Sequence, residues 1–476
     1  MSLKFKENKS IFLSVGKSIW KKLPVFFRNV LITTKNIGRF IVEKISSILK
    51  ILKKWEKILI ISLLLVIVIS SLCLIYSNYL KNTHITQNYG GSYIEGIVGD
   101  NKAEIDQAIQ KLTKIGLTYY DENNALQPAI AEKWEISDDG KTYTFYLKDK
   151  TDSGKIAETI NSHKNEWNDI QIETPDSKTI KFILKDSYSP FLAKTAQPIF
   201  EYGPYKIDKQ VNFEITFLKN PDFVLDKPYL ENIVLKIYPD EENLAKGYAQ
   251  GKIMGMAETI NGDFKSLNIY NMPLPRYEIV FFNLNREQFQ NKEVRQKIKN
   301  NEKLGNEIKA TLVTSNKEKN IARAEELKSK WDSLGLKIEI KTYDPMELQK
   351  EILPNRNYDM LLYGIDYGYD PDPYPFWHTS QMISSGLNLS NFSNQKADGF
   401  LEEGRKTIDQ NVRNEKYQEF QKVLDDEVPA IFLNQDIWKY SVSSKIKGVK
   451  DHNGITPADR FNEIWKWYTN ERRVKN

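Results

Sequence analysis

The chain has 476 residues, which is longer than one hydrophobic core supports and favours two or three domains. Its formal charge of +5 is uneven, because residues 1–57 hold 14 lysines and arginines against 3 acidic residues. The remainder is therefore acidic, and the composition does not indicate nucleic-acid binding by the folded part. The single cysteine, Cys73, excludes a disulfide framework and a cysteine-based metal site within one chain. The four histidines are scattered without metal-ligand spacing, so no metal site is expected.

The amino-terminal segment, residues 1–57, consists of short basic pieces with apolar residues at roughly helical spacing. Such helices can lie on an anionic membrane face with their lysines at the headgroups. A weakly ordered basic tail that only enforces membrane orientation fits the same composition. We expect this segment to be cytoplasmic.

An uncharged apolar run follows, from Ile58 to Leu80. A helix needs about 20 apolar residues to cross a bilayer, so residues 58–80 are predicted to form a transmembrane signal anchor. The run is too long for a cleaved signal peptide, and Leu72 before Cys73 does not fit a lipoprotein cleavage site. The lysines and arginines before the run place the amino terminus inside. Residues 81–91 then form a polar tether, and the rest of the chain lies outside the bacterial cytoplasmic membrane.

From Tyr93 onward the pattern alternates short strands and helices. Asp139-Gly140 is predicted as the turn of a β-hairpin, since it separates two alternating apolar segments. After Leu304 a strand, a helix ending at Gly335, a second strand, another helix and a third strand follow in order. This rhythm predicts a parallel sheet covered by helices.

A loop rich in acidic, aromatic and proline residues lies within residues 358–392. Its aspartates are Asp366, Asp370 and Asp372, and alternate prolines at positions 371, 373 and 375 exclude a regular helix. Carboxylates among flat rings at a strand end could hold an extended ligand with a cationic end. A rigid solvated loop with its aromatic rings packed underneath is the other interpretation.

Six segments, in order, resemble the family 5 extracellular solute-binding proteins, the peptide/nickel-type receptors of ABC importers. They are LQPAIAEKWEISDDGKTYTFYLKD, EYGPYKI, FLKNPDFVLDKPYLENIVLKIYPDEENLAKGYAQGKIMG, RYEIVFFNLNREQFQNKEVRQKI, YDMLLYGIDYGYDPDPYPFWHTSQ and SNQKADGFLEEGRKTIDQNVRNEKYQEFQKVLDDEVPAIFL. The resemblance covers about residues 90–450. The family's segment after the TYTFYLKD strand is absent, and the helical stretch after EVRQKI is short.

The resemblance implies an α/β, two-lobed, periplasmic-binding-protein-like fold (type II, peptide-binding subclass) after the transmembrane helix. Lobe I would comprise residues 92–272 and 436–476, and lobe II residues 276–433. In peptide-binding members a second-lobe aspartate pairs with the ligand's α-ammonium group, and Asp366 matches it through Gly364-Ile365-Asp366. The other expected ligand-binding residues are Asp370, Tyr367, Trp377, Tyr202 and Gly203.

The sequence contains no catalytic motif that we can identify, so we expect a binding protein and not an enzyme, without a cofactor. One hypothesis is a membrane-anchored receptor that captures oligopeptides for ABC permease subunits. The alternative is a reduced relative without ligand that serves as a surface scaffold or interaction protein. Binding of another solute, such as nickel or haem, is a third option. An enclosed interlobe cavity with an accessible Asp366 would favour the first hypothesis, and a cleft filled by side chains the second.

Overall fold

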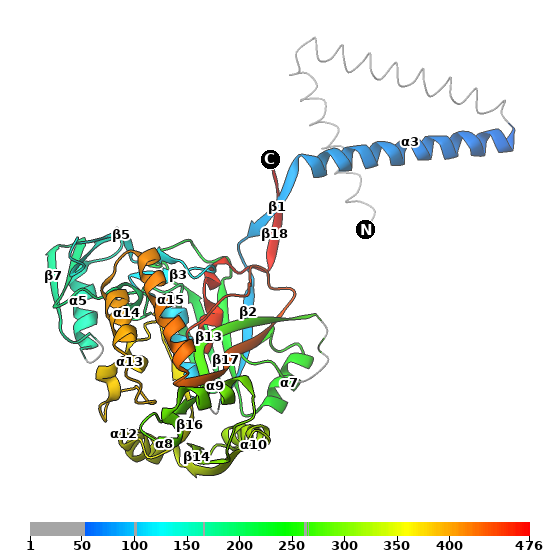
Figure 1. Cartoon of the computed structure of the whole chain (residues 1–476). Coiled ribbons are helices and arrows are strands. Elements are labelled where there is room, and N and C mark those ends of the chain that lie inside the picture. The colour runs from blue at the N-terminus through cyan, green and yellow to red at the C-terminus, as the bar shows by residue number, and fades with distance from the viewer. Residues whose placement is uncertain (1–52, 100–101, 165–166, 261–263, 265) are drawn as a thin grey trace. The chain divides into compact units, whose positions relative to one another are not determined.

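The computed structural model describes residues 53–99, 102–164, 167–260, 264 and 266–476 (Figure 1). Most of the predicted basic segment, residues 1–52, lies outside the described residues. The chain forms two compact units, one with residues up to Thr86 together with Arg473–Asn476, and one with Gln87–Arg472.

The first unit contains a long apolar helix, α3 (Lys54–Lys81). The apolar run thus forms a helix, which begins four residues before Ile58 and is long and apolar enough to cross a membrane, with a mean hydropathy of 3.2. Directly after it, strand β1 (Thr83–Asn88) pairs with β18 (Asn470–Lys475) at the end of the chain. Within the predicted polar tether, residues 81–91, the structure therefore forms a paired strand that the sequence analysis did not expect. Its partner lies almost 400 residues away, so no local pattern revealed it.

The second unit contains all the remaining elements. Its strands are β2 (Ser92–Val98), β3 (Thr118–Tyr120), β4 (Leu126–Pro128), β5 (Ala131–Ile136), β6 (Thr142–Leu147), β7 (Ile170–Asp176), β8 (Thr179–Leu184), β9 (Tyr205–Val211), β10 (Glu214–Lys219), β11 (Asn232–Tyr238), β12 (Gly255–Met256), β13 (Leu267–Phe282), β14 (Ile308–Ser315), β15 (Leu336–Tyr343), β16 (Met360–Asp366) and β17 (Ala430–Ser443). Its helices are α4 (Lys102–Thr113), α5 (Ser153–Ser162), α6 (Phe191–Lys194), α7 (Glu241–Ala249), α8 (Glu287–Gln290), α9 (Lys292–Asn300), α10 (Glu318–Asp332), α11 (Pro345–Glu347), α12 (Leu353–Asn355), α13 (Tyr374–Trp377), α14 (Gln395–Lys406) and α15 (Gln410–Glu427), with short η1 (Leu348–Ile352), η2 (Thr379–Met382), η3 (Pro457–Phe461) and η4 (Ile464–Lys466).

A ten-stranded sheet runs through this unit in the order β15-β14-β16-β13-β17-β12-β2-β11-β10-β9. The long antiparallel strands β13 and β17 lie side by side at its centre (Figure 1). Their register breaks between Pro273 and Tyr277, where prolines interrupt the ladder. Below, lobe I denotes β2 to β12 with the residues after β17, and lobe II denotes α8 to α15.

Lobe II has two cores, because successive residues of a strand point to opposite faces of the sheet. Ile279 and Phe281 of β13 pack with α14 and α15, through Leu401 and Phe420 among others. On the other face, Val280 and Phe282 pack with α10. The strands β14, β15 and β16 pair in parallel, so the parallel sheet predicted from the strand and helix rhythm is confirmed.

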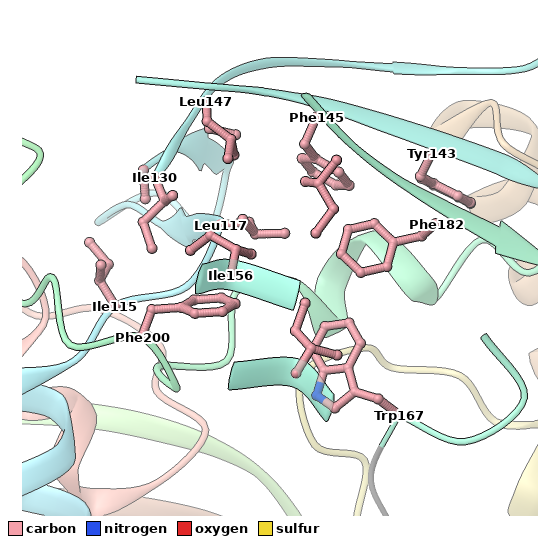
Figure 2. Close-up of a cluster of buried hydrophobic side chains, with 14 of the residues drawn as sticks. Ile115, Leu117, Ile130, Tyr143, Phe145, Leu147, Ile156, Trp167, Phe182 and Phe200 are labelled. Carbon is pink, nitrogen blue, oxygen red and sulfur yellow. The ribbon is translucent and has the colours of Figure 1, made fainter. Parts of the chain in front are cut away.

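Lobe I carries a separate four-stranded sheet, β5-β6-β8-β7, covered by α5. Its core is aromatic, and Phe145 meets Phe182 edge to face with ring centroids 5.6 Å apart (Figure 2). The predicted hairpin turn at Asp139-Gly140 joins β5 and β6, with Gly140 at a positive φ of 68°. This sheet supplies Ile136 and Tyr143 to the cavity described next.

Candidate ligand-binding site

A cavity of about 630 Å³ lies between lobe I and lobe II. Lobe I contributes α4, the β3–β4 hairpin, α6 and the segment around η3, while lobe II contributes the loop after β16 and the start of α15. Pro273, Pro275 and Gln435, from the interrupted part of β13 and the adjacent part of β17, also line it. The volume falls within the range of small-molecule sites, about 300–1,000 Å³.

One ion pair lines the cavity from lobe I. Lys111 of α4 donates its Nζ to Asp459 Oδ1 at 2.6 Å. The other carboxylate oxygen of Asp459 accepts the backbone N–H groups of Ile455 and Thr456, each at 2.9 Å. Burial alone would raise the pKa of Asp459, but the Lys111 ammonium and these N–H groups hold it below its usual value. Asp459 is therefore ionised near neutral pH, and these bonds hold its carboxylate in place.

A second ion pair lines the cavity from lobe II. Arg413 of α15 binds both carboxylate oxygens of Asp370, with Nη1 to Oδ2 at 2.8 Å. Burial would lower the pKa of the guanidinium, but the bonds to Asp370 raise it, so Arg413 stays charged. Asp370 is thus the one predicted ligand residue that lines this cavity.

Asp366 lies at the end of β16, directly opposite Arg276 of β13. Arg276 Nε donates to its Oδ2 at 2.8 Å, and the backbone N–H of Gly368 donates to Oδ1 at 2.9 Å. Both side chains are partly exposed, and neither lines the cavity.

The predicted aromatic residues of the loop pack into lobe II. Trp377 is fully buried and its Nε1 donates to Tyr367 Oη at 3.2 Å. Tyr367 also meets Phe376 edge to face, with centroids 5.0 Å apart. Tyr367 and Trp377 thus pack in the hydrophobic core of lobe II, and neither of them lines the cavity.

Tyr202 and Gly203 lie within lobe I, away from the cavity lining. Tyr202 is partly buried against the aromatic core of the four-stranded sheet. A Cβ atom at Gly203 would come within 2.3 Å of the Thr113 backbone, so glycine is required for the close approach to α4. Neither residue lines the cavity, so their predicted ligand contacts stay a prediction.

Sequence reasoning missed Lys111, Asp459, Arg413, Tyr119 and Tyr120. The two charged pairs join residues 348 and 43 positions apart, a separation that leaves no local signal. The tyrosines lie in a strand of three residues, too short to show periodicity. Burial raises the pKa of Tyr119 to about 12, so this phenol remains protonated near neutral pH.

The lobes also meet at the edge of the cavity. Tyr120 Oη of lobe I donates to the Tyr369 carbonyl of lobe II at 3.3 Å. Ser187 Oγ donates to the Lys406 carbonyl at 2.8 Å, and Ser189 N–H to the Arg405 carbonyl at 2.9 Å. These hydrogen bonds join the two lobes beside the cavity.

Comparison with protein families gives one decisive match. The family model for bacterial extracellular solute-binding proteins, family 5 (middle), matches residues 155–300, and the relatives below belong with it. The chain is thus similar to the family 5 extracellular solute-binding proteins, as the resemblance of its sequence predicted. The proteins of this family are binding proteins and not enzymes, and the family is extracytoplasmic.

Two curated relatives of this solute-binding protein come from Escherichia coli K12. A dipeptide-binding protein is 20% identical over 443 residues, covering 67% of this chain and 83% of the relative. A probable D,D-dipeptide-binding periplasmic protein is 21% identical and covers 67% of this chain and 81% of the relative.

Solved structures show the same two-lobed fold. A putative peptide-binding protein from Clostridium difficile has a TM-score of 0.68 at 18% identity, covering 79% of this chain and 100% of that one. A protein from Campylobacter jejuni in complex with Ni(L-His) has a TM-score of 0.59 at 19% identity, covering 79% and 99%. The predicted family and fold class are therefore confirmed.

Proposed function

We propose that this solute-binding protein captures oligopeptides between its lobes outside the cytoplasmic membrane and delivers them to an ABC importer. The observation that carries the proposal is the cavity, which is lined from both lobes and is not filled by side chains. Amide side chains and tyrosines contribute to its wall, and these groups can both donate to and accept from peptide units.

The cavity is not filled by side chains, which favours a receptor over a scaffold without ligand, for which we expected a filled cleft; Asp366, which we expected to be accessible in the cavity, lies outside its lining. Nickel binding has less support, because no cluster of histidine, cysteine, aspartate or glutamate able to hold a metal ion is found among the described residues. The relatives named for dipeptides point to peptides as the solute class.

We also propose that α3 spans the cytoplasmic membrane with residues 1–57 inside. The helix has 28 residues, and the bulk of its apolar side chains is exposed, which is unfavourable in water and favourable in lipid. The basic residues before it favour a cytoplasmic amino terminus.

We expect peptides to co-purify with the full-length chain and to be detected by native mass spectrometry in detergent. Asn453 is exposed and lines the cavity, so Asn453→Trp should fill the cavity and lower peptide occupancy at least about tenfold, a change of ~1.4 kcal/mol. Asn306→Trp is the matched control, since Asn306 is exposed and does not line this cavity. A wild-type chain that is empty and shows no thermal shift with a tripeptide mixture would reject the peptide receptor.

The orientation is testable because Cys73 is the single cysteine. In a Cys73→Ser background, Asp138→Cys places a thiol at an exposed position of lobe I. A membrane-impermeant maleimide should label it in intact cells, while Lys9→Cys should be labelled only after permeabilisation. The reverse labelling pattern would refute the proposed orientation.

A further inference from the structure

The charges in the cavity are already paired with one another. Among the described residues, the charged side chains that line it are Lys111, Asp370, Arg413 and Asp459. They form the two ion pairs described above, one in each lobe. The cavity wall therefore offers a ligand no net charge from either lobe.

Asp370 cannot exchange its partner for a ligand's ammonium group at low cost. The Arg413 side chain is only 6% exposed, and its Nε has no hydrogen-bond acceptor among the described residues. Besides its bonds to Asp370, the guanidinium makes one other hydrogen bond among the described residues, to Tyr417 Oη at 3.4 Å. Withdrawing Asp370 toward a ligand would leave a buried guanidinium without a counterion, which is strongly unfavourable.

Both carboxylate oxygens of Asp459 are likewise already bonded within the protein. Lys111 occupies one of its oxygens, and two backbone N–H groups of its own turn occupy the other. Asp366, the position expected to bind an α-ammonium group, lies outside the cavity lining and is bound by Arg276 and Gly368. None of the three carboxylates is placed to receive a cationic ligand end.

The rest of the lining is uncharged and suits neutral amide groups. It contains the side chains of Asn124, Gln410, Gln435, Asn453 and Asn462, with Tyr119, Tyr120, Tyr143, Tyr277 and Tyr369. Amides and phenols bond to peptide carbonyl and N–H groups without a charge, and the rings cover apolar side chains.

We propose that the ligand is a peptide whose amino terminus is blocked and uncharged, for example by an acyl group. The proposal rests on the peptide-binding function proposed above. An ammonium group bound here would give up hydrating water without gaining a carboxylate partner, whereas an N-acyl amide carries no charge to desolvate and could bond to the amide and phenol wall.

The test is titration calorimetry on the full-length chain in detergent with matched tripeptide amides of alanine, leucine and tyrosine. Each tripeptide is used with a free and with an acetylated amino terminus, so that only the charge and the acetyl group differ. We expect the acetylated members to bind at least about tenfold more tightly. Free-amine peptides that bind as tightly or more tightly would overturn the inference and leave the peptide receptor intact.

If neither series binds, the peptide-binding function fails and the inference fails with it. Arg276→Gln provides a second arm, because it releases Asp366 at a partly exposed position without touching the cavity. The preference for acetylated peptides should be unchanged in this variant. A tenfold gain in affinity for the free-amine series would show that Asp366 reaches the ligand and would also overturn the inference.

Discussion

Replacing Arg460 by methionine is expected to lower the free energy of unfolding by about 3–5 kcal/mol, the range for removing one partner of a buried ion pair. Arg460 and Glu95 are both completely buried, and Arg460 Nε donates to Glu95 Oε1 at 2.8 Å. Glu104, also buried, lies 3.7 Å from Arg460 Nη1. The methionine variant would leave the Glu95 carboxylate in the core of lobe I without the cation that it binds.

The measurement is urea denaturation of the full-length chain in detergent, followed by tryptophan fluorescence. Lys206→Met is the control, because the Lys206–Asp222 pair is half exposed and should contribute about 0–1 kcal/mol. Adding Glu95→Gln to Arg460→Met should recover part of the loss, since one uncompensated carboxylate is then removed. A loss below 1 kcal/mol for Arg460→Met would contradict the role given to this pair.

Replacing Trp377 by alanine should also lower the free energy of unfolding by about 3–5 kcal/mol, as is usual for a buried tryptophan. The side chain is 0% exposed and lies beneath the loop, against Phe281 and Phe432. Because it does not line the cavity, the folded fraction should bind an N-acetylated tripeptide amide with its wild-type affinity.

Tyr369→Ala is the matched variant in the same loop, since Tyr369 is half-buried and lines the cavity. We expect the opposite pattern, with affinity reduced and unfolding little changed. Denaturation curves and calorimetry on both variants separate the two effects. If Trp377→Ala kept wild-type stability but bound the peptide more weakly, the result would indicate that Trp377 contacts the ligand.

Elements whose pattern is local could be predicted from the sequence. The turn at Asp139-Gly140 needs a residue that tolerates positive φ, and glycine supplies it. The strands β14 and β15 follow one another with a helix between them, which requires a crossover and hence a parallel pair. The ordered resemblance of six segments predicted the family.

The lining of the cavity could be predicted less well, because its geometry depends on pairings between distant residues. The resemblance favoured Asp366 as the ligand-binding aspartate, whereas Asp370 is the one that lines the cavity. Arg413, 43 positions after Asp370, makes the difference, as does the register that places Arg276 opposite Asp366. The sequence also did not predict which aromatic rings of the loop are buried, since a ring after proline can face either the core or the cleft.

The pairing of β1 with β18 has a consequence for biosynthesis. β1 is made directly after the apolar helix and β18 ends one residue before the last of the chain. Strand β12 pairs with the earlier strand β2 but gains its second partner, β17, only when residues 441 and 442 have been made. In contrast, β14 to β16 and their helices come from one continuous stretch. Lobe II can therefore assemble before β18 is made, whereas the β1–β18 pair forms only once residues 470–475 have been synthesised. Strand β1, the first strand of the described residues to be made, is therefore the last to gain its partner.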